Sequence, residues 1–501
     1  MQTLRRVPAF GFGIFLLLAS AGCGSNGSAT LVHTTGNFSN ATLSGSYVYQ
    51  IHGIASPNGV NLVPYRQVGV FVADGNGNIT GGSDDSSFGA SGVAITGAYT
   101  VSSDGTGSIT FNNSSIGTAL NFAITVSGSS QVQMIENDSA LNGGGNAVSQ
   151  DSTAAGTIPS GTFVLRLHQE QSAQNSGEEA SQVGAFALSG GAGSGAMDQD
   201  LNGTLTTPGL NASFNAPVSF GRGTATLTDT TASFTTDLVY YVVNSNQFVL
   251  LVNSGGAIGS GSAEAQSGVV SGTGLSGTYA FGSRGDDLSS GVDGVATVGL
   301  FTANAGSLSG NQDVMQDGNY TANAGFPSTC FTAGAAGGMN GRVAATSGGS
   351  PCSGTITQVF WMVSPNRAFF LDNTGTTFQD GTADLQTTNS FSASTFKGQF
   401  AMVMDGFDLV NGQPLARVGA LQFDGTSKAS LAEDANGLLS GVVQQGLTGS
   451  YTVGANGRVV ENLSGSNGFL DLVMYPVSGS QAYILQQDGG IITSGTVILQ
   501  Q

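Results

Sequence analysis

One pattern of residues recurs four times along the chain at nearly constant spacing. A Gly followed two positions later by an aromatic residue ends at Tyr47, Phe163, Tyr279 and Phe400, at intervals of 116, 116 and 121 residues. A Val-Gly pair begins at Val68, Val183, Val298 and Val418, and a glutamine closes each copy at Gln150, Gln266, Gln386 and Gln500. Such self-similarity indicates tandem copies of one folding unit, and we expect four, at residues 43–151, 159–268, 275–386 and 396–501.

Each unit has the pattern of short antiparallel strands. Residues alternate in character from Tyr47 to His52, which is the period of a half-buried strand. Turn sequences such as Asp74–Gly77 and Asp104–Gly107 separate the runs. Glycine supplies 79 of the 501 residues and only 9% are charged, which disfavours long solvated helices. Unit 1 is predicted to have about eight strands, near residues 45–54, 66–73, 78–83, 94–102, 107–112, 120–126, 130–137 and 145–150.

The predicted fold class is therefore all-β, with four antiparallel units in tandem. Strands joined by hairpins favour a small up-and-down barrel, because closure removes the exposed sheet edges. Seven or eight strands would also suit an immunoglobulin-like β-sandwich. The barrel is preferred because nearly every connection has the length and residues of a hairpin.

The order of motifs in unit 1 resembles that of the avidin and lipocalin (calycin) barrels. The motifs are the Gly before Tyr47, the Asp74-Gly75 turn and the stretch Thr96–Tyr99, followed by two paired apolar strands. The resemblance implies small barrels. It does not carry biotin binding with it, since avidins hold biotin largely with Trp side chains and the only Trp here is Trp361.

The first residues have the pattern of an export signal. Arg5 and Arg6 precede an apolar stretch that is too short to span a bilayer. The run from Ser20 to Cys23 resembles the lipobox of bacterial lipoproteins, although Ser20 stands where Leu is usual. The resemblance implies a signal peptide at 1–22, lipidation of Cys23, and a flexible tether at 23–42. An ordinary cleavage site at Ala19–Ala21 is the alternative, and it would release a soluble product.

The whole chain is similar to uncharacterised repeat lipoproteins of soil bacteria. This likeness implies a location in the cell envelope, at the outer membrane or cell surface, and implies no activity. The other two cysteines, Cys330 and Cys352, lie in unit 3. In an oxidising compartment we expect them to form a disulfide rather than a metal site, because no His is close in sequence.

Charge and histidine content exclude some functions. The formal net charge of −19 makes nucleic-acid binding through phosphates implausible. His33 falls in the tether. His52 and His168 occupy equivalent positions in units 1 and 2, where units 3 and 4 have Arg284 and Asp405. No partner for these histidines can be identified in the sequence, so we expect solvent-facing strand positions.

Acidic residues recur after the second hairpin of each unit: Asp84 and Asp85, Asp198 and Asp200, Asp313 and Asp317, Glu433 and Asp434. The main expectation is that they form turns or aid solubility. A glycosidase pair is one alternative. Calcium is another, with Asp74, Asn76, Asn78 and Asp85 as weak candidates, because Asp74–Asn78 resembles the start of an EF-hand loop but has Ile79 where that loop requires Gly.

No catalytic or cofactor motif emerges from these patterns. The sequence favours a non-enzymatic, lipid-anchored envelope protein that displays its β units for surface binding or adhesion. The expected partners are a membrane, through the anchor, and an unknown surface ligand such as a glycan or a protein. Two alternatives remain open: a carrier of small ligands or glycans inside the barrels, and a secreted hydrolase that uses residues such as Asp84 and Asp85.

Overall fold

The computed structural model describes residues 36–501, apart from 57–60, 172–178, 288–292, 349–351, 375–376, 389 and 467. The predicted signal peptide at 1–22, Cys23 and His33 lie outside the described residues. The described residues belong to one compact unit. No helix within the described part of the chain is long and apolar enough to cross a bilayer. The short 3-10 helices are η1 (Asn40–Thr42), η2 (Ala154–Gly156) and η3 (Ser219–Gly221).

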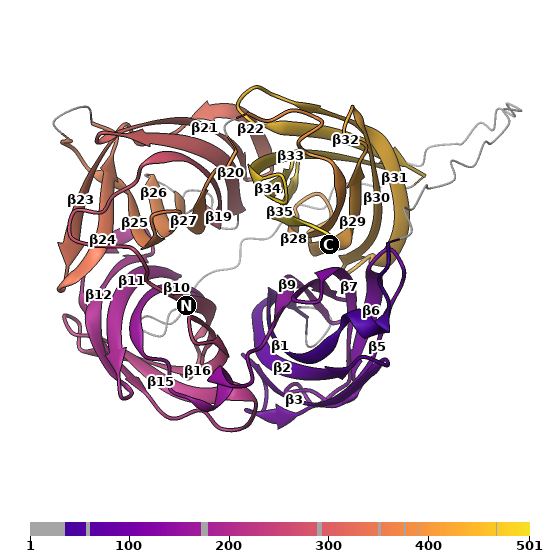
Figure 1. Cartoon of the computed structure of the whole chain (residues 1–501), viewed down its shortest axis with the longest axis horizontal. Helices are drawn as coiled ribbons and strands as arrows, with labels where there is room; N and C mark the ends of the chain where they lie inside the picture. The colour runs from indigo at the N-terminus through magenta and orange to yellow at the C-terminus, as the bar shows by residue number, and fades with distance from the viewer. Residues whose placement is uncertain are drawn as a thin grey trace, which may run out of the picture. The chain divides into compact units, whose positions relative to one another are not determined.

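Four sheets follow one another along the chain, and each contains one copy of the repeat (Figure 1). Barrel 1 contains β1 (Ser44–Ala55), β2 (Val63–Asp74), β3 (Asn78–Ser86), β4 (Val93–Ala94), β5 (Gly97–Val101), β6 (Thr106–Phe111), β7 (Leu120–Gly128), β8 (Gln131–Glu136) and β9 (Leu141–Ser149). Barrel 2 contains β10 (Gly161–Gln171), β11 (Ala180–Ser189), β12 (Ala192–Leu201), β13 (Thr204–Thr206), β14 (Gly209–Phe214), β15 (Arg222–Asp229), β16 (Phe234–Asn244), β17 (Gln247–Val252) and β18 (Ile258–Ala265).

The other two barrels repeat this order of strands. Barrel 3 contains β19 (Gly277–Asp287), β20 (Asp293–Asn304), β21 (Ser307–Gln316), β22 (Asn319–Gly325), β23 (Cys330–Ala336), β24 (Met339–Thr346), β25 (Ile356–Ser364), β26 (Arg367–Thr374) and β27 (Thr377–Leu385). Barrel 4 contains β28 (Gly398–Asp408), β29 (Gln413–Phe423), β30 (Lys428–Gly437), β31 (Gly441–Val453), β32 (Val459–Gly465), β33 (Gly468–Ser478), β34 (Gln481–Gln486) and β35 (Ile491–Leu499).

Every sheet closes on itself, so the predicted all-β barrel fold is confirmed and the sandwich alternative is wrong. In the first three barrels eight strands close through the pairings β2–β3, β11–β12 and β20–β21. The additional strands β4, β13 and β22 pair with the third strand of their barrel, outside the closed set of eight. Barrel 4 is a closed barrel of eight strands. Barrel 3 has one weak point: β21 pairs with β23 only through Ser307 and Cys330. A disulfide between Cys330 and Cys352 lies at this point.

The structure explains why two positions of the repeat are occupied by glycine. The first strand begins at or just before a Gly with positive φ in all four barrels, from 100° to 130° at Gly45, Gly161, Gly277 and Gly398, a conformation that disfavours other residues. The Val-Gly marker places Gly69 against the ring of Tyr49, where an added Cβ would lie 2.5 Å from the hydroxyl oxygen. The first marker therefore starts the first strand in every barrel, and the second makes room for an aromatic side chain in barrel 1.

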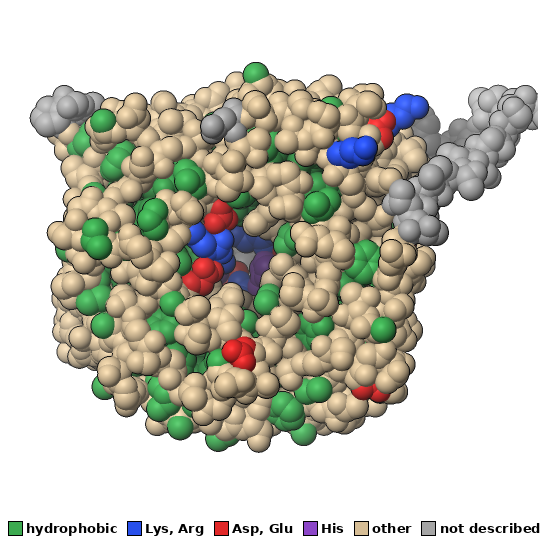
Figure 2. All heavy atoms as spheres, viewed as in Figure 1, with side chains coloured by type: hydrophobic (Ala, Val, Ile, Leu, Met, Phe, Trp, Pro, Cys, Tyr) green, Lys and Arg blue, Asp and Glu red, His purple; other side chains and the backbone are tan. Residues whose placement is uncertain are grey.

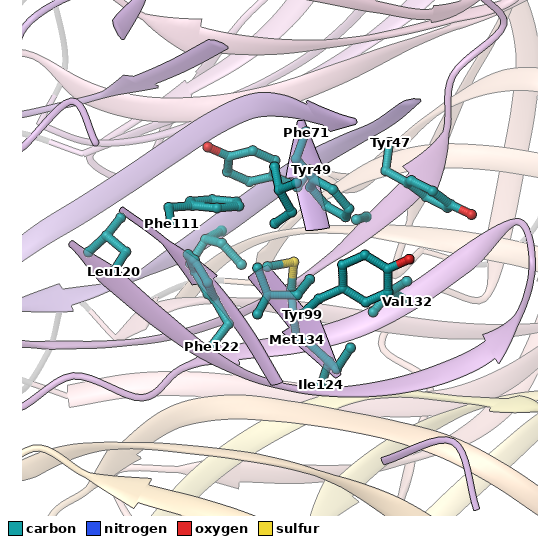
Figure 3. Close-up of a cluster of buried hydrophobic side chains, with 14 of the residues drawn as sticks. Tyr47, Tyr49, Phe71, Tyr99, Phe111, Leu120, Phe122, Ile124, Val132 and Met134 are labelled. Carbon is teal, nitrogen blue, oxygen red and sulfur yellow. The ribbon is translucent and has the colours of Figure 1, made fainter. Parts of the chain in front are cut away.

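Each barrel is filled by its own apolar core. In barrel 1 the rings of Tyr47 and Phe71 stack at 5.3 Å, and Phe111 meets Phe122 edge-on at 5.1 Å (Figure 3). The corresponding cores of the other barrels contain 15 to 20 buried residues. Side chains thus occupy the interiors in which a carrier would hold its ligand.

A second set of apolar contacts joins the barrels to one another. The outer face of the first two strands of one barrel packs on the outer face of the sixth and seventh of the eight closing strands of the next. Val68 and Val70 meet Tyr241 between barrels 1 and 2. The same contact recurs between barrels 2 and 3, between barrels 3 and 4, and between barrel 4 and barrel 1. Each contact joins one kind of face to the other, and the contact between barrel 4 and barrel 1 closes the ring.

The glutamine that closes each repeat makes the same bond at all four junctions. Its side-chain Nε2 donates to a backbone carbonyl in the next barrel: Gln150 to Val242, Gln266 to Met362, Gln386 to Pro476 and Gln500 to Val126. The backbone N–H of the following residue also donates to that strand, as from Asp151 to Val243 and from Gln501 to Ser127. Gln500, the last of the four closing glutamines, therefore connects barrel 4 to barrel 1.

Three of the four junctions also contain a buried ion pair, which we call the latch. An acid on the third strand of one barrel binds an Arg and an aromatic side chain of the next. The latches are Asp85 with Arg222 and Tyr241, Asp198 with Arg342 and Trp361, and Asp313 with Arg458 and Tyr475. The three acids are at most 2% exposed.

The junction between barrels 4 and 1 lacks the latch. Thr106 and Thr125 stand at the register positions that the Arg and the aromatic residue occupy elsewhere. Asn142 and Asn436 join these barrels instead: the amide of Asn142 donates to the carbonyl of Asn436, and that of Asn436 donates to the carbonyl of Glu136. The ring therefore closes through a junction with different chemistry.

Candidate functional site

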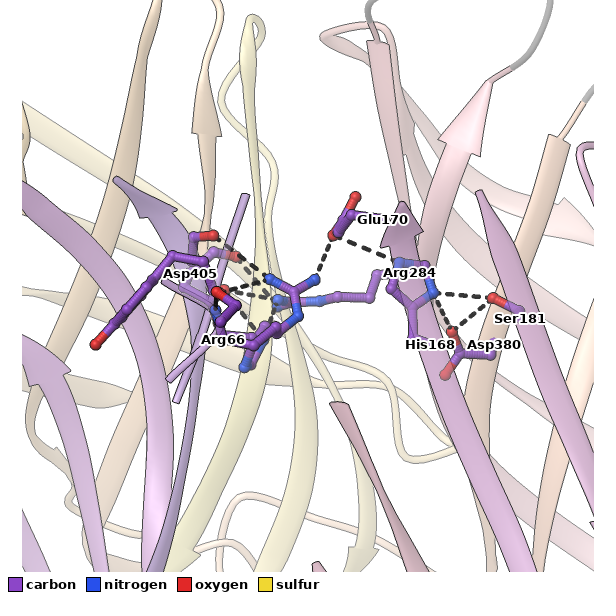
Figure 4. Close-up of polar contacts among 11 residues, drawn as sticks. Arg66, His168, Glu170, Ser181, Arg284, Asp380 and Asp405 are labelled. Atoms are coloured by element: carbon purple, nitrogen blue, oxygen red, sulfur yellow. Dashed lines mark hydrogen bonds and ion pairs between the residues drawn. The ribbon is translucent and has the colours of Figure 1, made fainter. Parts of the chain in front are cut away.

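The first strands of the barrels bring charged side chains to the centre of the ring. Figure 2 shows acidic, basic and histidine side chains gathered around a hollow there. We call this group the central cluster, and it comprises His52, Arg66, Arg166, His168, Glu170, Ser181, Arg284, Asp380 and Asp405. Figure 4 shows its contacts.

Arg284 connects three of the barrels. Its Nη1 lies 2.6 Å from His52 Nε2 and 2.7 Å from Asp405 Oδ2, and its Nη2 donates to the carbonyl of Ser494. Burial lowers the pKa of His52 despite the opposing effect of Asp405. Burial alone would raise the pKa of Asp405, but Arg284 and His52 hold it well below its usual range.

His168 forms the other half of the cluster. Its Nδ1 lies 2.7 Å from Asp380 Oδ1 and 2.9 Å from Ser181 Oγ, and its Nε2 lies 3.4 Å from Glu170 Oε1. Arg66 of barrel 1 bonds to the same oxygen of Glu170. Burial disfavours a charged imidazole, but Asp380 and Glu170 prevail and raise the pKa of His168 well above its ordinary value.

The expectation that no partner meets His52 and His168 is therefore wrong. Both lie on the outward face of a strand, as expected, and their side chains are 34% and 18% exposed, but that face turns to the central hollow, where residues of neighbouring barrels contact both rings. The four equivalent positions, which hold His52, His168, Arg284 and Asp405, line the centre of one ring. A signal for this grouping is present in the sequence, because His, Arg and Asp occupy the same place in different repeats.

A further pair of acids lies beside His168. Glu179, just before β11, and Asp286 on β19 face each other across barrels 2 and 3. Burial and the neighbouring Asp286 raise the pKa of Glu179 to about 10, and burial raises that of Asp286. Among the described residues, His168, Glu170 and Asp286 form the one group whose ligand atoms are close enough to hold a metal ion.

The expectation that the recurring acids form turns or aid solubility is wrong for most of them. Asp85, Asp198 and Asp313 form the latches. Asp84 points into barrel 1, where Tyr49, Gln67 and the Ser115 N–H bond to it. Glu433 bonds to Arg417 within barrel 4. Asp317 lies in a turn between β21 and β22, as expected.

These placements also remove two site hypotheses. Asp84 and Asp85 are 0% and 2% exposed and fully bonded, so they cannot meet a glycan as a hydrolytic pair. Asp74 lies six residues along β2 from Val68, the partner of Asp85, roughly 20 Å away at 3.3 Å per residue. Asp74 instead accepts bonds from Asn76 and Asn78 within its own turn. The four calcium candidates are therefore not brought together.

Asp200 and Asp372 are a pair of buried acids between barrels 2 and 3. They are 1% and 4% exposed, and both oxygens of Asp200 lack a hydrogen-bond partner. Burial raises the pKa of each to about 6, and Asp372 adds to the effect on Asp200. Both are therefore uncharged at acidic pH and charged at neutral pH.

We expect Asp200→Asn to raise the free energy of unfolding by about 2–3 kcal/mol near pH 7.5 and to change it little near pH 3. An acid with a raised folded-state pKa has no penalty while it is protonated in both states. Stability is lost as the pH rises through the unfolded value towards the folded value of about 6. Denaturant unfolding of both proteins at the two pH values measures the difference.

The control is Asp74→Asn. Bonds from Asn78 and Asn76 lower the pKa of Asp74 to about 2, so this substitution should destabilise at neutral pH. An equal gain from Asp200→Asn at both pH values would contradict the electrostatic explanation.

One pocket opens at the end of barrel 2. Its volume is about 450 Å³, within the usual range for small-molecule sites. Seven of its ten lining residues have polar side chains, with Thr204, Thr206, Thr231, Asn202 and Gln199 among them. Because barrel 2 has its own filled core, this pocket lies at the mouth of the barrel and not in a hollow interior.

Comparisons with known proteins give little likeness. No family model and no curated protein matches the chain. The intact TbpB with N and C lobes shares 10% identity over 75% of this chain and 86% of its own, with a TM-score of 0.18. Transferrin-binding protein B of Haemophilus parasuis shares 8% identity over 74% and 82%, and that of Neisseria meningitidis 9% over 74% and 83%, with TM-scores of 0.17 and 0.19. These TM-scores are too low to carry an argument about this chain.

Proposed function

We propose that this chain is a non-enzymatic lipoprotein of the cell envelope, which is held to a membrane through Cys23 and displays a ring of four barrels for binding at the cell surface. The observation that supports the proposal is that the Arg side chains form ion pairs, most of them between barrels. All eight Arg residues after position 22 form ion pairs with acids, and seven of them join different barrels. Charged groups that could act in catalysis thus serve to hold the barrels together.

Loops and barrel ends then remain as binding surfaces. The pocket at the mouth of barrel 2 is the best candidate for a small polar ligand such as a sugar, because hydroxyl and amide groups suit hydrogen bonding to it. This proposal replaces the carrier hypothesis that relied on barrel interiors.

Lipidation is tested by expressing the full chain and its Cys23→Ser variant in a bacterial host with labelled palmitate. We expect label and membrane association for the wild type only. Equal labelling of both, or no labelling of either, would exclude an anchor at Cys23.

Ligand binding is tested with the intact protein on a glycan array. Thr206→Trp should fill the pocket and remove binding at this site. The matched control is Ala94→Trp, on the corresponding short strand β4 of barrel 1, and it should retain binding. Binding that survives Thr206→Trp would place the ligand elsewhere on the ring.

A further inference from the structure

The imidazole of His168 is held as metal-binding histidines usually are. Asp380 and Ser181 both contact Nδ1, at 2.7 and 2.9 Å. A carboxylate on one ring nitrogen fixes the ring and directs the other nitrogen to a metal. Here the other nitrogen, Nε2, is directed to carboxylates.

Two strands from different barrels supply these carboxylates. Glu170 follows His168 by two residues on β10, so both side chains lie on the same face of the strand. Asp286 comes from β19 of barrel 3. One ligand atom from each of the three residues lies within 4.8 Å of the others. In a tetrahedral zinc site the ligand atoms are roughly 3.4 Å apart, so modest side-chain rotations would complete the geometry.

Glu179 supplies a second, independent indication. Its carboxyl group lies in hydrogen-bonding contact with that of Asp286, although neither ionised carboxylate can donate. Its Oε2 is buried and has no hydrogen-bond partner. Two facing carboxylates need a shared proton or a cation close to them, and a cation bound by Asp286 would meet that need.

We propose that His168, Glu170 and Asp286 bind one divalent transition-metal cation, such as Zn²⁺, that links barrels 2 and 3 at the centre of the ring, beside Glu179. An imidazole with carboxylates suits zinc and similar ions. Arg66 bonds to Oε1 of Glu170, and a carboxylate can accept from an Arg through one oxygen while it ligates through the other. Asp380 supports the site from outside by orienting His168.

The equivalent histidine of barrel 1 provides a matched control. His52 Nε2 lies 2.6 Å from Nη1 of Arg284, a cation that occupies the position a metal would need. His52 and His168 therefore share a register position and differ in what faces Nε2.

The experiment uses the full-length protein, purified without a histidine tag and stripped by a chelator. Zinc chloride is titrated by calorimetry, and Co²⁺ serves as a spectroscopic probe through its d–d absorption. We expect one zinc per chain, a rise in melting temperature with zinc, and at least a tenfold loss of affinity in His168→Gln and in Asp286→Asn. His52→Gln should bind zinc like the wild type.

Circular dichroism of the metal-free variants shows whether each one folds, and the two variants supply independent tests if one does not. The proposal is overturned if the wild type binds no zinc, if folded His168→Gln or Asp286→Asn binds as the wild type does, or if His52→Gln loses binding equally. An unchanged Co²⁺ spectrum in folded His168→Gln would also overturn it.

Discussion

Replacing Asp313 by Ala is expected to lower the free energy of unfolding by about 3–5 kcal/mol. Asp313 accepts bonds from Arg458 at 2.7 and 2.8 Å and from the hydroxyls of Tyr475 and Tyr320. Its side chain is fully buried, so its removal leaves the guanidinium of Arg458 without a counter-charge in an apolar junction. Denaturant unfolding followed by circular dichroism measures the loss.

Asp434 is the matched control for Asp313. It occupies the equivalent register position, opposite Val418 as Asp313 is opposite Val298, but faces the junction that lacks the latch. The described residues form no ion pair with it, and burial raises its pKa. Asp434→Ala should change stability by less than about 1 kcal/mol. Equal losses from the two substitutions would show that the latch itself contributes nothing.

Removing the disulfide of barrel 3 has the second largest expected effect. Changing both Cys330 and Cys352 to Ala should lower the free energy of unfolding by about 3 kcal/mol, because the bond closes a loop with a sequence separation of 22 residues. The bond also lies where a single residue pair joins β21 to β23. Barrel 3 should therefore open before the others.

Trp361 reports on this change, because it is the only Trp and is fully buried between barrels 2 and 3. Its fluorescence transition should move to lower denaturant in the double variant. Wild-type protein treated with a reductant should behave in the same way. A transition at the wild-type midpoint would mean that the sheet alone holds barrel 3 closed.

Much of the fold could be predicted because it depends on local pattern. The strands expected near 45–54 and 120–126 are β1 and β7 with small shifts at their ends. The two-residue alternation along each strand predicted which side chains share a face, and Tyr47 and Tyr49 do lie together in the core of barrel 1. The turn residues predicted the positions of the hairpins, because the conformational preferences of glycine and aspartate act over only a few residues.

The site was harder to predict, because its parts lie far apart in sequence. His168 and Asp380 are separated by 212 residues, and Arg284 and His52 by 232. Runs such as Val239–Val243 are apolar at every position, which is typical of strands buried on both faces. Those runs indicate that the barrels pack on one another.

The sequence by itself determined four copies of an all-β unit and the strands within them, because both follow from neighbouring residues and the two-residue period of a strand. Only the tertiary structure decided that the outer faces meet in a ring, that Gln500 returns to barrel 1, and that the recurring acids pair with Arg of the next barrel. The physical reason is that a face of a strand is polar or apolar in sequence, but what covers it depends on how whole barrels pack together.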